Sequence, residues 1–76
     1  MSRSKTLATL SAGESAIIKS IREGSTISKR LMEMGLLPGA YVEVVKEAPF
    51  GSPVQIRIKG YNLALRKSEA EFVEVY

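Results

Sequence analysis

The side chains that most often carry out catalysis or hold transition metals are missing from this sequence of 76 residues. It contains no cysteine and no histidine, so neither the usual base-activated nucleophile nor a thiolate or imidazole metal site can be assembled. The acids are eight glutamates spread along the chain, whereas a hard-cation site needs several oxygens converging from a short loop. We therefore expect no catalytic residue, no metal ligand and no bound cofactor.

Nucleotide chemistry and acid–base catalysis by glutamate are not indicated either. None of the six glycines begins the sequence G-x-x-x-x-G-K-[ST], whose backbone amides and lysine hold nucleotide phosphates. Two close glutamate pairs, Glu43 with Glu47 and Glu69 with Glu71, fall on segments expected to be strand and turn surfaces, where nothing would bury them. The sequence therefore predicts a protein that is not an enzyme.

A basic group late in the chain suggests one binding function. Arg57, Lys59 and Arg66 lie on a predicted hairpin, and Tyr61 could stack on a base, as in small nucleic-acid-binding barrels. Strand alternation also places Glu43 on the same outer face as Arg57, so cross-strand ion pairs would offset much of the positive charge. A nucleic-acid-binding barrel is therefore the alternative function.

An excess of apolar side chains, in the stretch LMEMGLLPG, suggests another binding function. Ile27, Leu31 and Met34 are spaced as one inward helical stripe, and the other large apolar side chains here cannot all point inward as well. They either cap the open end of a small barrel or form an apolar contact surface, and the two roles are compatible. The predicted partner-binding residues are Met32, Leu36, Leu37 and Pro38, with Lys29, Arg30 and Glu33 as a polar rim.

Length and composition limit the fold to one small domain. At 76 residues and 45% apolar content, the chain can build a thin core. We expect the domain to span 1–76, with 1–6 as a frayed basic N-terminal arm. The first residues lack the apolar segment of a signal peptide, and no apolar run approaches the ~20 residues of a membrane helix. We therefore expect a cytoplasmic protein without direct membrane insertion.

One short helix is expected to carry the apolar stripe. Ser25 or Thr26 would cap its start by accepting a hydrogen bond from a free backbone N–H. Gly35 would end it in the left-handed conformation that glycine adopts most easily. In such a closure Leu31 and Leu36 are the pair expected to touch.

Strand patterns precede and follow this helix. Residues 15–21 are rich in β-branched side chains, but the pattern leaves open whether Ile18 or the pair Ile17 and Ile21 points inward. Two further segments alternate more regularly and predict strands. The inward valines expected in these strands, 41–47 and 72–76, are Val42, Val44, Val73 and Val75.

The clearest pattern is a hairpin in VQIRIKGYNLALRK. A two-residue turn at Gly60 and Tyr61 would pair Ile58 with Leu63 and keep the large aliphatic residues of both strands on one face. Ser68 would then cap a single helical turn before the last strand.

Five short strands around so thin a core favour a strongly bent barrel, because closure removes the exposed edges of a flat sheet. We predict a mainly β, five-stranded SH3-like barrel with one short α-helix at about 26–34 and a single helical turn before the last strand. Weak homo-oligomerisation, through the apolar corner or an open strand edge, is a third hypothesis.

The sequence resembles the FeoA family, small SH3-like proteins associated with bacterial ferrous iron uptake. The resemblance spans the chain from Leu7 and is carried by LMEMGLLPG, VEVV, APFGSPVQI and KGYNLALRKSEA, in this order. Phe50 stands where the family more often has Leu, and Ser52 where it more often has Asp. The resemblance implies an accessory partner of FeoB, a membrane protein that carries a cytosolic GTPase domain and transports ferrous iron. The expected function is therefore to dock on the cytosolic region of a FeoB-like transporter and to assist or regulate it.

Overall fold

The computed structural model describes residues 5–22 and 26–76. Short strands dominate it, and the helical elements are one α-helix of eight residues and two shorter turns. The elements in chain order are β1 (Lys5–Thr6), η1 (Leu7–Thr9), β2 (Ser15–Ile21), α1 (Thr26–Glu33), β3 (Tyr41–Glu47), β4 (Val54–Ile58), β5 (Tyr61–Leu65), α2 (Lys67–Ala70) and β6 (Val73–Val75).

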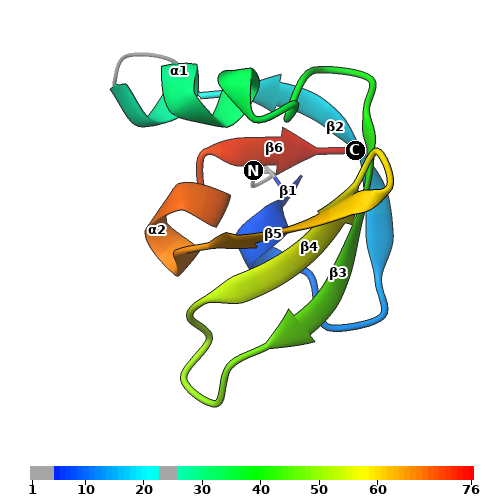
Figure 1. Cartoon of the computed structure of the whole chain (residues 1–76), viewed down its shortest axis with the longest axis vertical. Helices are drawn as coiled ribbons and strands as arrows, with labels where there is room; N and C mark the ends of the chain where they lie inside the picture. The colour runs from blue at the N-terminus through cyan, green and yellow to red at the C-terminus, as the bar shows by residue number, and fades with distance from the viewer. Residues whose placement is uncertain (1–4, 23–25) are drawn as a thin grey trace, which may run out of the picture.

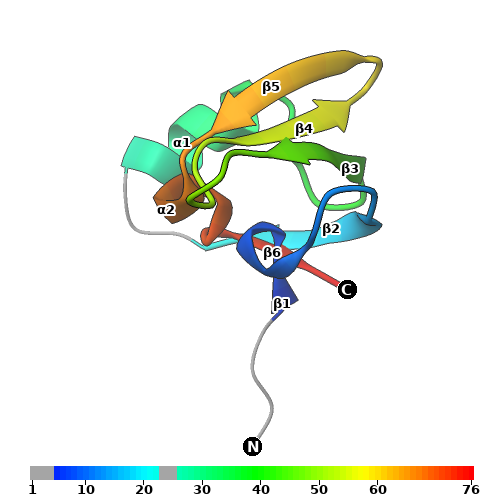
Figure 2. The ribbon, with the colours of Figure 1, turned by 90° about the horizontal axis from the view of Figure 1, so that it is seen from below.

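The strands form one antiparallel sheet in the order β1-β6-β2-β3-β4-β5. The sheet bends back on itself, so that β3, β4 and β5 face β2, β6 and β1 across the core (Figure 2). The two end strands, β1 and β5, are not paired with each other, and the predicted barrel is therefore not closed by hydrogen bonds. Helix α1 lies over one end of the molecule, and the loop between β3 and β4 forms the other end (Figure 1).

The core is aliphatic and is supplied by β2 to β6, by α1 and by residues around η1. The predicted inward valines of two strands are confirmed: Val42, Val44, Val73 and Val75 are at most 3% exposed. The mainly β, SH3-like architecture expected from the sequence is thus confirmed, with six strands in place of five.

The sixth strand corrects the prediction of a frayed arm over 1–6. Lys5 pairs with Val75 and Thr6 with Glu74, so these two residues belong to the sheet. Leu7, which follows directly, is fully buried. Two residues are too few for an alternation pattern, so the sequence carried no strand signal here. Residues 1–4 of the predicted arm lie outside the described residues.

A bulge in β2 resolves the ambiguity between its isoleucines. Ile18 pairs with Val75 and Ser20 with Glu74, so that Lys19 is an extra residue on the β2 side. An extra residue reverses the alternation that follows it. Ile18 and Ile21 are therefore both buried, while Ile17 points outward, a combination that strict alternation cannot produce.

The hairpin turn lies one residue earlier than predicted, which shifts the strand pairing by two residues. Its two-residue turn is Lys59 and Gly60, which have φ angles of +51° and +85°, and Ile58 pairs with Tyr61. Positive φ at both central residues defines the type I′ turn that suits two-residue hairpins. The predicted turn at Gly60 and Tyr61 was therefore wrong, although the shift of two residues in pairing leaves Leu65 on the inner face as expected.

The turn before the last strand is also capped differently from the prediction. Helix α2 follows Arg66, whose backbone N–H donates to the Glu69 carboxylate at 2.9 Å. The predicted cap, Ser68, lies inside α2. At the start of α1, Thr26 is the first helical residue, and the other predicted cap, Ser25, lies outside the described residues.

Candidate partner-binding surface

The end of α1 decides which apolar residues of the LMEMGLLPG stretch reach the surface. Gly35 has a φ angle of +100°, as expected for a helix-closing glycine. The Leu36 N–H donates to the Leu31 carbonyl at 3.1 Å, and the Gly35 N–H donates to the Met32 carbonyl at 3.0 Å. This pair of bonds is the Schellman motif, and it turns the chain sharply inward at Leu36.

The closure separates two neighbouring leucines that the sequence analysis had both assigned to the contact surface, although it also expected Leu36 to touch Leu31. Leu36 is fully buried in the same core cluster as Leu31, whereas 41% of Leu37 is exposed. The prediction that Leu36 belongs to a contact surface is therefore wrong, because the Schellman motif turns this side chain into the core, and an apolar residue at this position frequently packs back onto the helix.

Three of the predicted apolar residues remain at the surface. Met32 is 37% exposed, Leu37 is 41% exposed, and Pro38 is also exposed. We call these three residues the corner surface. The predicted polar rim, Lys29, Arg30 and Glu33, is exposed on α1 beside it.

Arg30 of this rim also has a structural contact. Its guanidinium lies 3.4 Å from the carboxylate of Glu69, a side chain that is 9% exposed and that also accepts the Arg66 N–H. The side chain of Arg30 is itself 66% exposed. Arg30 therefore links α1 to α2 while it keeps part of its surface open to a partner.

Apolar side chains that the sequence analysis did not select extend the surface over the strands. Ile17 of β2 and Tyr41 of β3 are cross-strand neighbours, and both are exposed. The Tyr76 N–H donates to the Ile17 carbonyl at 3.1 Å, and Tyr76 is 72% exposed. The turn that carries Leu37 is held against β2, since the Gly39 N–H donates to the Ile18 carbonyl at 2.8 Å.

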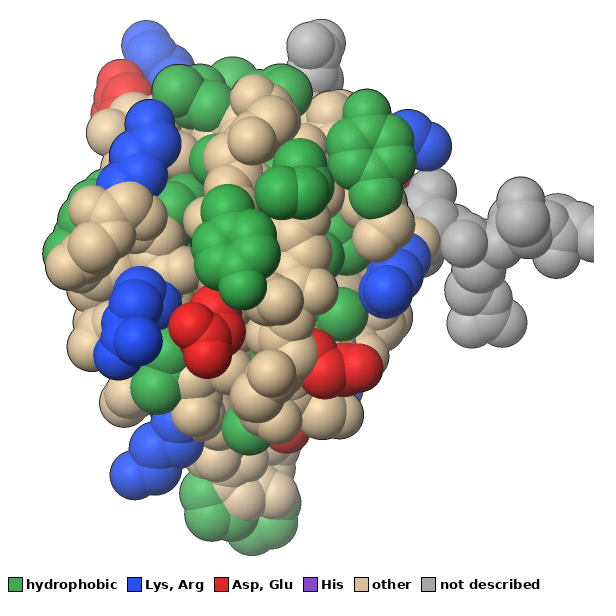
Figure 3. Space-filling view, turned by 90° about the vertical axis from the view of Figure 1, so that its right-hand side faces the viewer, with side chains coloured by type: hydrophobic (Ala, Val, Ile, Leu, Met, Phe, Trp, Pro, Cys, Tyr) green, Lys and Arg blue, Asp and Glu red, His purple; other side chains and the backbone are tan. Residues whose placement is uncertain are grey.

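Figure 3 looks onto this side of the molecule and shows hydrophobic side chains gathered in its upper part, with basic side chains toward both sides. The signal that could have revealed these residues is the outward position of Ile17. The sequence left that position open, because the choice between Ile17 and Ile18 depends on how β2 pairs with its neighbouring strands, which a single sequence does not display.

Two members of the basic hairpin of the alternative function, Arg57 and Tyr61, make contacts within the chain, while Lys59 and Arg66 are exposed. The Arg57 guanidinium lies 4.0 Å from the Glu43 carboxylate, and its Nε donates to the Asn62 side-chain oxygen at 3.4 Å. The Tyr61 hydroxyl donates to the Met34 carbonyl at the end of α1. The structure therefore does not gather Arg57 and Tyr61 into one open binding face.

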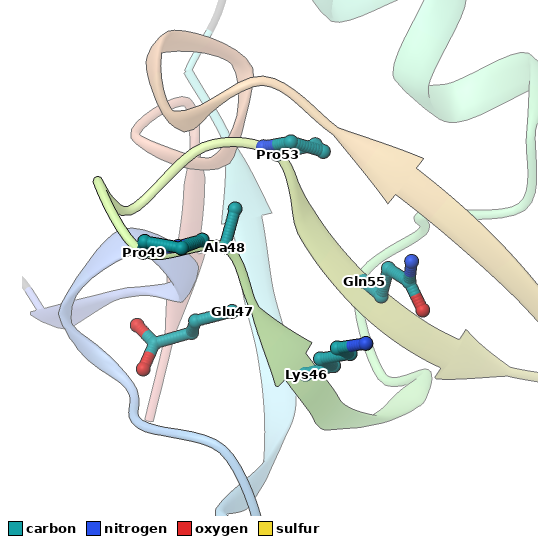
Figure 4. Close-up of a pocket in the computed structure, with 6 residues that line it drawn as sticks. All are labelled: Lys46, Glu47, Ala48, Pro49, Pro53 and Gln55. Atoms are coloured by element: carbon teal, nitrogen blue, oxygen red, sulfur yellow. The ribbon is translucent and has the colours of Figure 1, made fainter.

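A shallow pocket of about 230 Å³ lies at the opposite end of the molecule (Figure 4). Its walls are Lys46, Glu47, Ala48, Pro49, Pro53 and Gln55. Small-molecule sites combine an apolar cavity with a few convergent polar groups. The glutamate and glutamine side chains extend in different directions here, so the pocket offers no such convergence.

Metal-binding clusters and membrane-spanning helices were considered for the described part of the chain. Within residues 5–22 and 26–76, no three acidic, histidine or cysteine side chains lie close enough together to hold a metal ion. In the same residues no helix has the length and apolar content needed to cross a membrane.

The bent antiparallel sheet with a short helix before its last strand defines an SH3-like domain, and comparisons with known proteins agree. An FeoA-like protein from Clostridium acetobutylicum superimposes with a TM-score of 0.90 at 30% identity, over 100% of this chain and 88% of that one. The FeoA of Stenotrophomonas maltophilia, described as a prokaryotic SH3 domain protein and crystallised with zinc, gives a TM-score of 0.84 at 33% identity, over 93% and 88% of the two chains.

The sequence comparisons identify the family. The FeoA domain model matches residues 5–76, and the chain belongs to the FeoA family. An Fe(2+) transport protein A/Fe(2+) transporter FeoB fusion protein from Porphyromonas gingivalis is 38% identical over 69 residues, which are 91% of this chain. The chain spans only 8% of the length of that relative. The name of the fusion protein links this family to ferrous iron transport.

Proposed function

We propose that this protein is a non-enzymatic accessory protein of bacterial ferrous iron uptake that docks in the cytoplasm on the cytosolic region of a FeoB-type transporter and assists or regulates it. The observation that carries the proposal is the Porphyromonas gingivalis relative, in which an FeoA part and a FeoB part share one chain. Fusion raises the effective concentration of two modules for each other, and this favours the association of modules that bind each other when they are separate.

The corner surface is the docking site that we propose within this function. Met32 offers a flexible side chain that adapts to a partner, and Leu37 and Pro38 add rigid apolar area beside it. Exposed charged residues on α1 surround this apolar centre. An apolar centre with a polar rim is the usual organisation of a protein–protein contact.

The test is binding of purified variants to the purified cytosolic region of a FeoB-type transporter, measured by titration calorimetry. Leu37→Asp and Met32→Asp should each weaken binding by more than about tenfold, because a carboxylate would be buried without a partner. Both side chains are partly exposed, so both variants should stay folded by circular dichroism.

Phe50→Asp is the matched control. Phe50 is 95% exposed in the loop between β3 and β4, at the end of the molecule opposite α1 (Figure 1). This variant should bind within about twofold of the unchanged protein if the corner surface is the contact. Unchanged affinity of both corner variants would remove the site assignment, whereas no binding by the unchanged protein would remove the proposed function itself.

A further inference from the structure

The free edge of β5 is a hydrogen-bonding template that the fold leaves open. Strand β5 is the last strand of the sheet and pairs only with β4 among the described residues. It is the outermost strand of its half of the molecule in Figure 2. A strand in this position presents unpaired backbone groups to any extended chain that approaches it.

The register identifies those backbone groups. Ile58 and Tyr61 close the two-residue turn and are a hydrogen-bonded pair, and such pairs alternate along an antiparallel ladder. The next hydrogen-bonded position on β5 is therefore Leu63. The N–H and C=O groups of Asn62 and Ala64 then point away from β4, and both residues are exposed. The open template consists of four backbone groups on two residues.

The other end of the sheet is protected in a way that β5 is not. Strand β1 has only two residues, and the chain turns into η1 directly after it. The Thr6 N–H donates to the Thr9 hydroxyl at 3.3 Å, and that hydroxyl donates to the Thr6 carbonyl at 2.7 Å. Short length and local side-chain bonds are common protections for an edge strand. Within residues 5–22 and 26–76, β5 is therefore the edge that is available for strand addition.

The charges beside β5 determine which kind of extended segment can pair with its free edge. Lys59 comes just before the strand, and Arg66 and Lys67 follow it directly. Glu69, the nearest acid along the chain, is buried and already paired with Arg30. Both ends of the edge are therefore positive, and an added strand with negative ends would be attracted to it.

The same charges argue against a second copy of this chain. Two β5 strands pair fully when Asn62 of each lies opposite Ala64 of the other in an antiparallel arrangement. In that register the turn that carries Lys59 in one copy approaches the start of α2, which carries Lys67, in the other. Like charges are thus brought toward each other at both ends of the pair, which disfavours this arrangement.

We propose that the free edge of β5 binds an extended segment of a partner protein with acidic residues at both ends, which adds to the sheet as a further strand. Backbone hydrogen bonds to Asn62 and Ala64 supply the affinity, and the flanking Lys59, Arg66 and Lys67 supply the preference for acidic residues. The proposal goes beyond docking on a transporter, and it is tested without one.

The experiment uses two synthetic peptides and the full chain. Each peptide alternates valine and threonine over five residues and is acetylated and amidated, with a glutamate at each end in one and a lysine at each end in the other. NMR titration at low salt should show the glutamate peptide binding at least about tenfold more tightly. Hydrogen exchange at the Asn62 and Ala64 amides should slow about tenfold with that peptide, whereas the Leu63 amide, already paired with β4, should change little.

Two variants with a matched control test the geometry. Ala64→Pro removes an outward N–H and should abolish peptide binding, while pairing with β4 survives because proline is tolerated on an edge strand. Ala64→Ser keeps the N–H and should bind like the unchanged protein. If the proline variant fails to fold, the double variant Lys59→Glu with Lys67→Glu serves instead, and it should prefer the lysine peptide.

Three results would overturn the proposal. The Asn62 and Ala64 amides could remain unprotected with both peptides, a folded Ala64→Pro variant could bind as tightly as the unchanged protein, or the double variant could keep the preference for glutamate. Sedimentation of the unchanged protein provides the last check, because dimers that disappear in Ala64→Pro would make a second copy the occupant in place of an acidic partner.

Discussion

Replacing the two neighbouring leucines one at a time separates core from surface at the end of α1. Leu36→Ala removes a fully buried side chain, while Leu37→Ala removes one that is 41% exposed. The two substitutions have the same chemistry and lie in the same turn. Any difference between their effects on the free energy of unfolding therefore reports the burial of the two side chains.

The magnitudes follow from that burial. Leucine to alanine removes about three methylene equivalents at about 0.8 kcal/mol each when the side chain is fully buried. The cavity left at Leu36 adds to this, and we expect a loss of about 3 kcal/mol. Leu37 has less buried area and leaves no enclosed cavity, and we expect a loss of about 1 kcal/mol. At about 5 °C per kcal/mol for a domain of this size, the melting temperatures should fall by about 15 °C and about 5 °C.

Urea unfolding followed by circular dichroism measures both losses, with the slope of the transition as a test of two-state behaviour. In the binding assay with the transporter's cytosolic region the order should reverse, so that Leu37→Ala weakens binding more than a folded Leu36→Ala. Equal losses of stability, or a larger loss for Leu37→Ala, would refute the argument from the Schellman motif.

The remaining predictions concern the contacts that hold the two helices. Glu69→Ala should lower the free energy of unfolding by about 2 kcal/mol in urea titrations, because a nearly buried carboxylate that accepts the Arg66 N–H is lost. Arg30→Ala should lower it by less than about 0.5 kcal/mol, because the Arg30 side chain is mostly exposed. Equal losses for the two variants would contradict this order. Gly35→Ala should lower the free energy of unfolding by about 1–2 kcal/mol, since the φ angle of Gly35 is +100° and an added Cβ would lie 3.1 Å from the Tyr61 hydroxyl. Thermal unfolding measures this loss, and an unchanged melting temperature would contradict the prediction.

The sequence was most informative where a pattern depends only on nearby residues. The alternation of Val42 with Val44 and of Val73 with Val75 predicted their burial correctly, because side-chain direction in a strand alternates at every residue. Gly35 was correctly assigned as the end of the helix, because the left-handed backbone conformation that closes a helix is adopted most easily by glycine.

Local patterns failed wherever an insertion or a turn shifted the strand pairing. The extra residue Lys19 places both Ile18 and Ile21 in the core, and the type I′ turn at Lys59 and Gly60 moves the hairpin register by two residues. The bulge is set by pairing with β6, which is distant in the sequence, whereas the hairpin register is set by the turn type that joins β4 to β5.

The candidate surface, too, could be predicted from the sequence only in part. The sequence by itself determined that this chain has no cysteine or histidine and that its corner carries more large apolar side chains than one helical stripe can hold. The helix-closing glycine already indicated a contact between Leu31 and Leu36, but only the tertiary structure decided that Leu36 is lost from the surface while Leu37 stays exposed, that Tyr41 lies beside Ile17, and that β5 keeps an open edge. The physical reason is that residue types are properties of the chain, whereas exposure and pairing depend on contacts between segments far apart in the sequence.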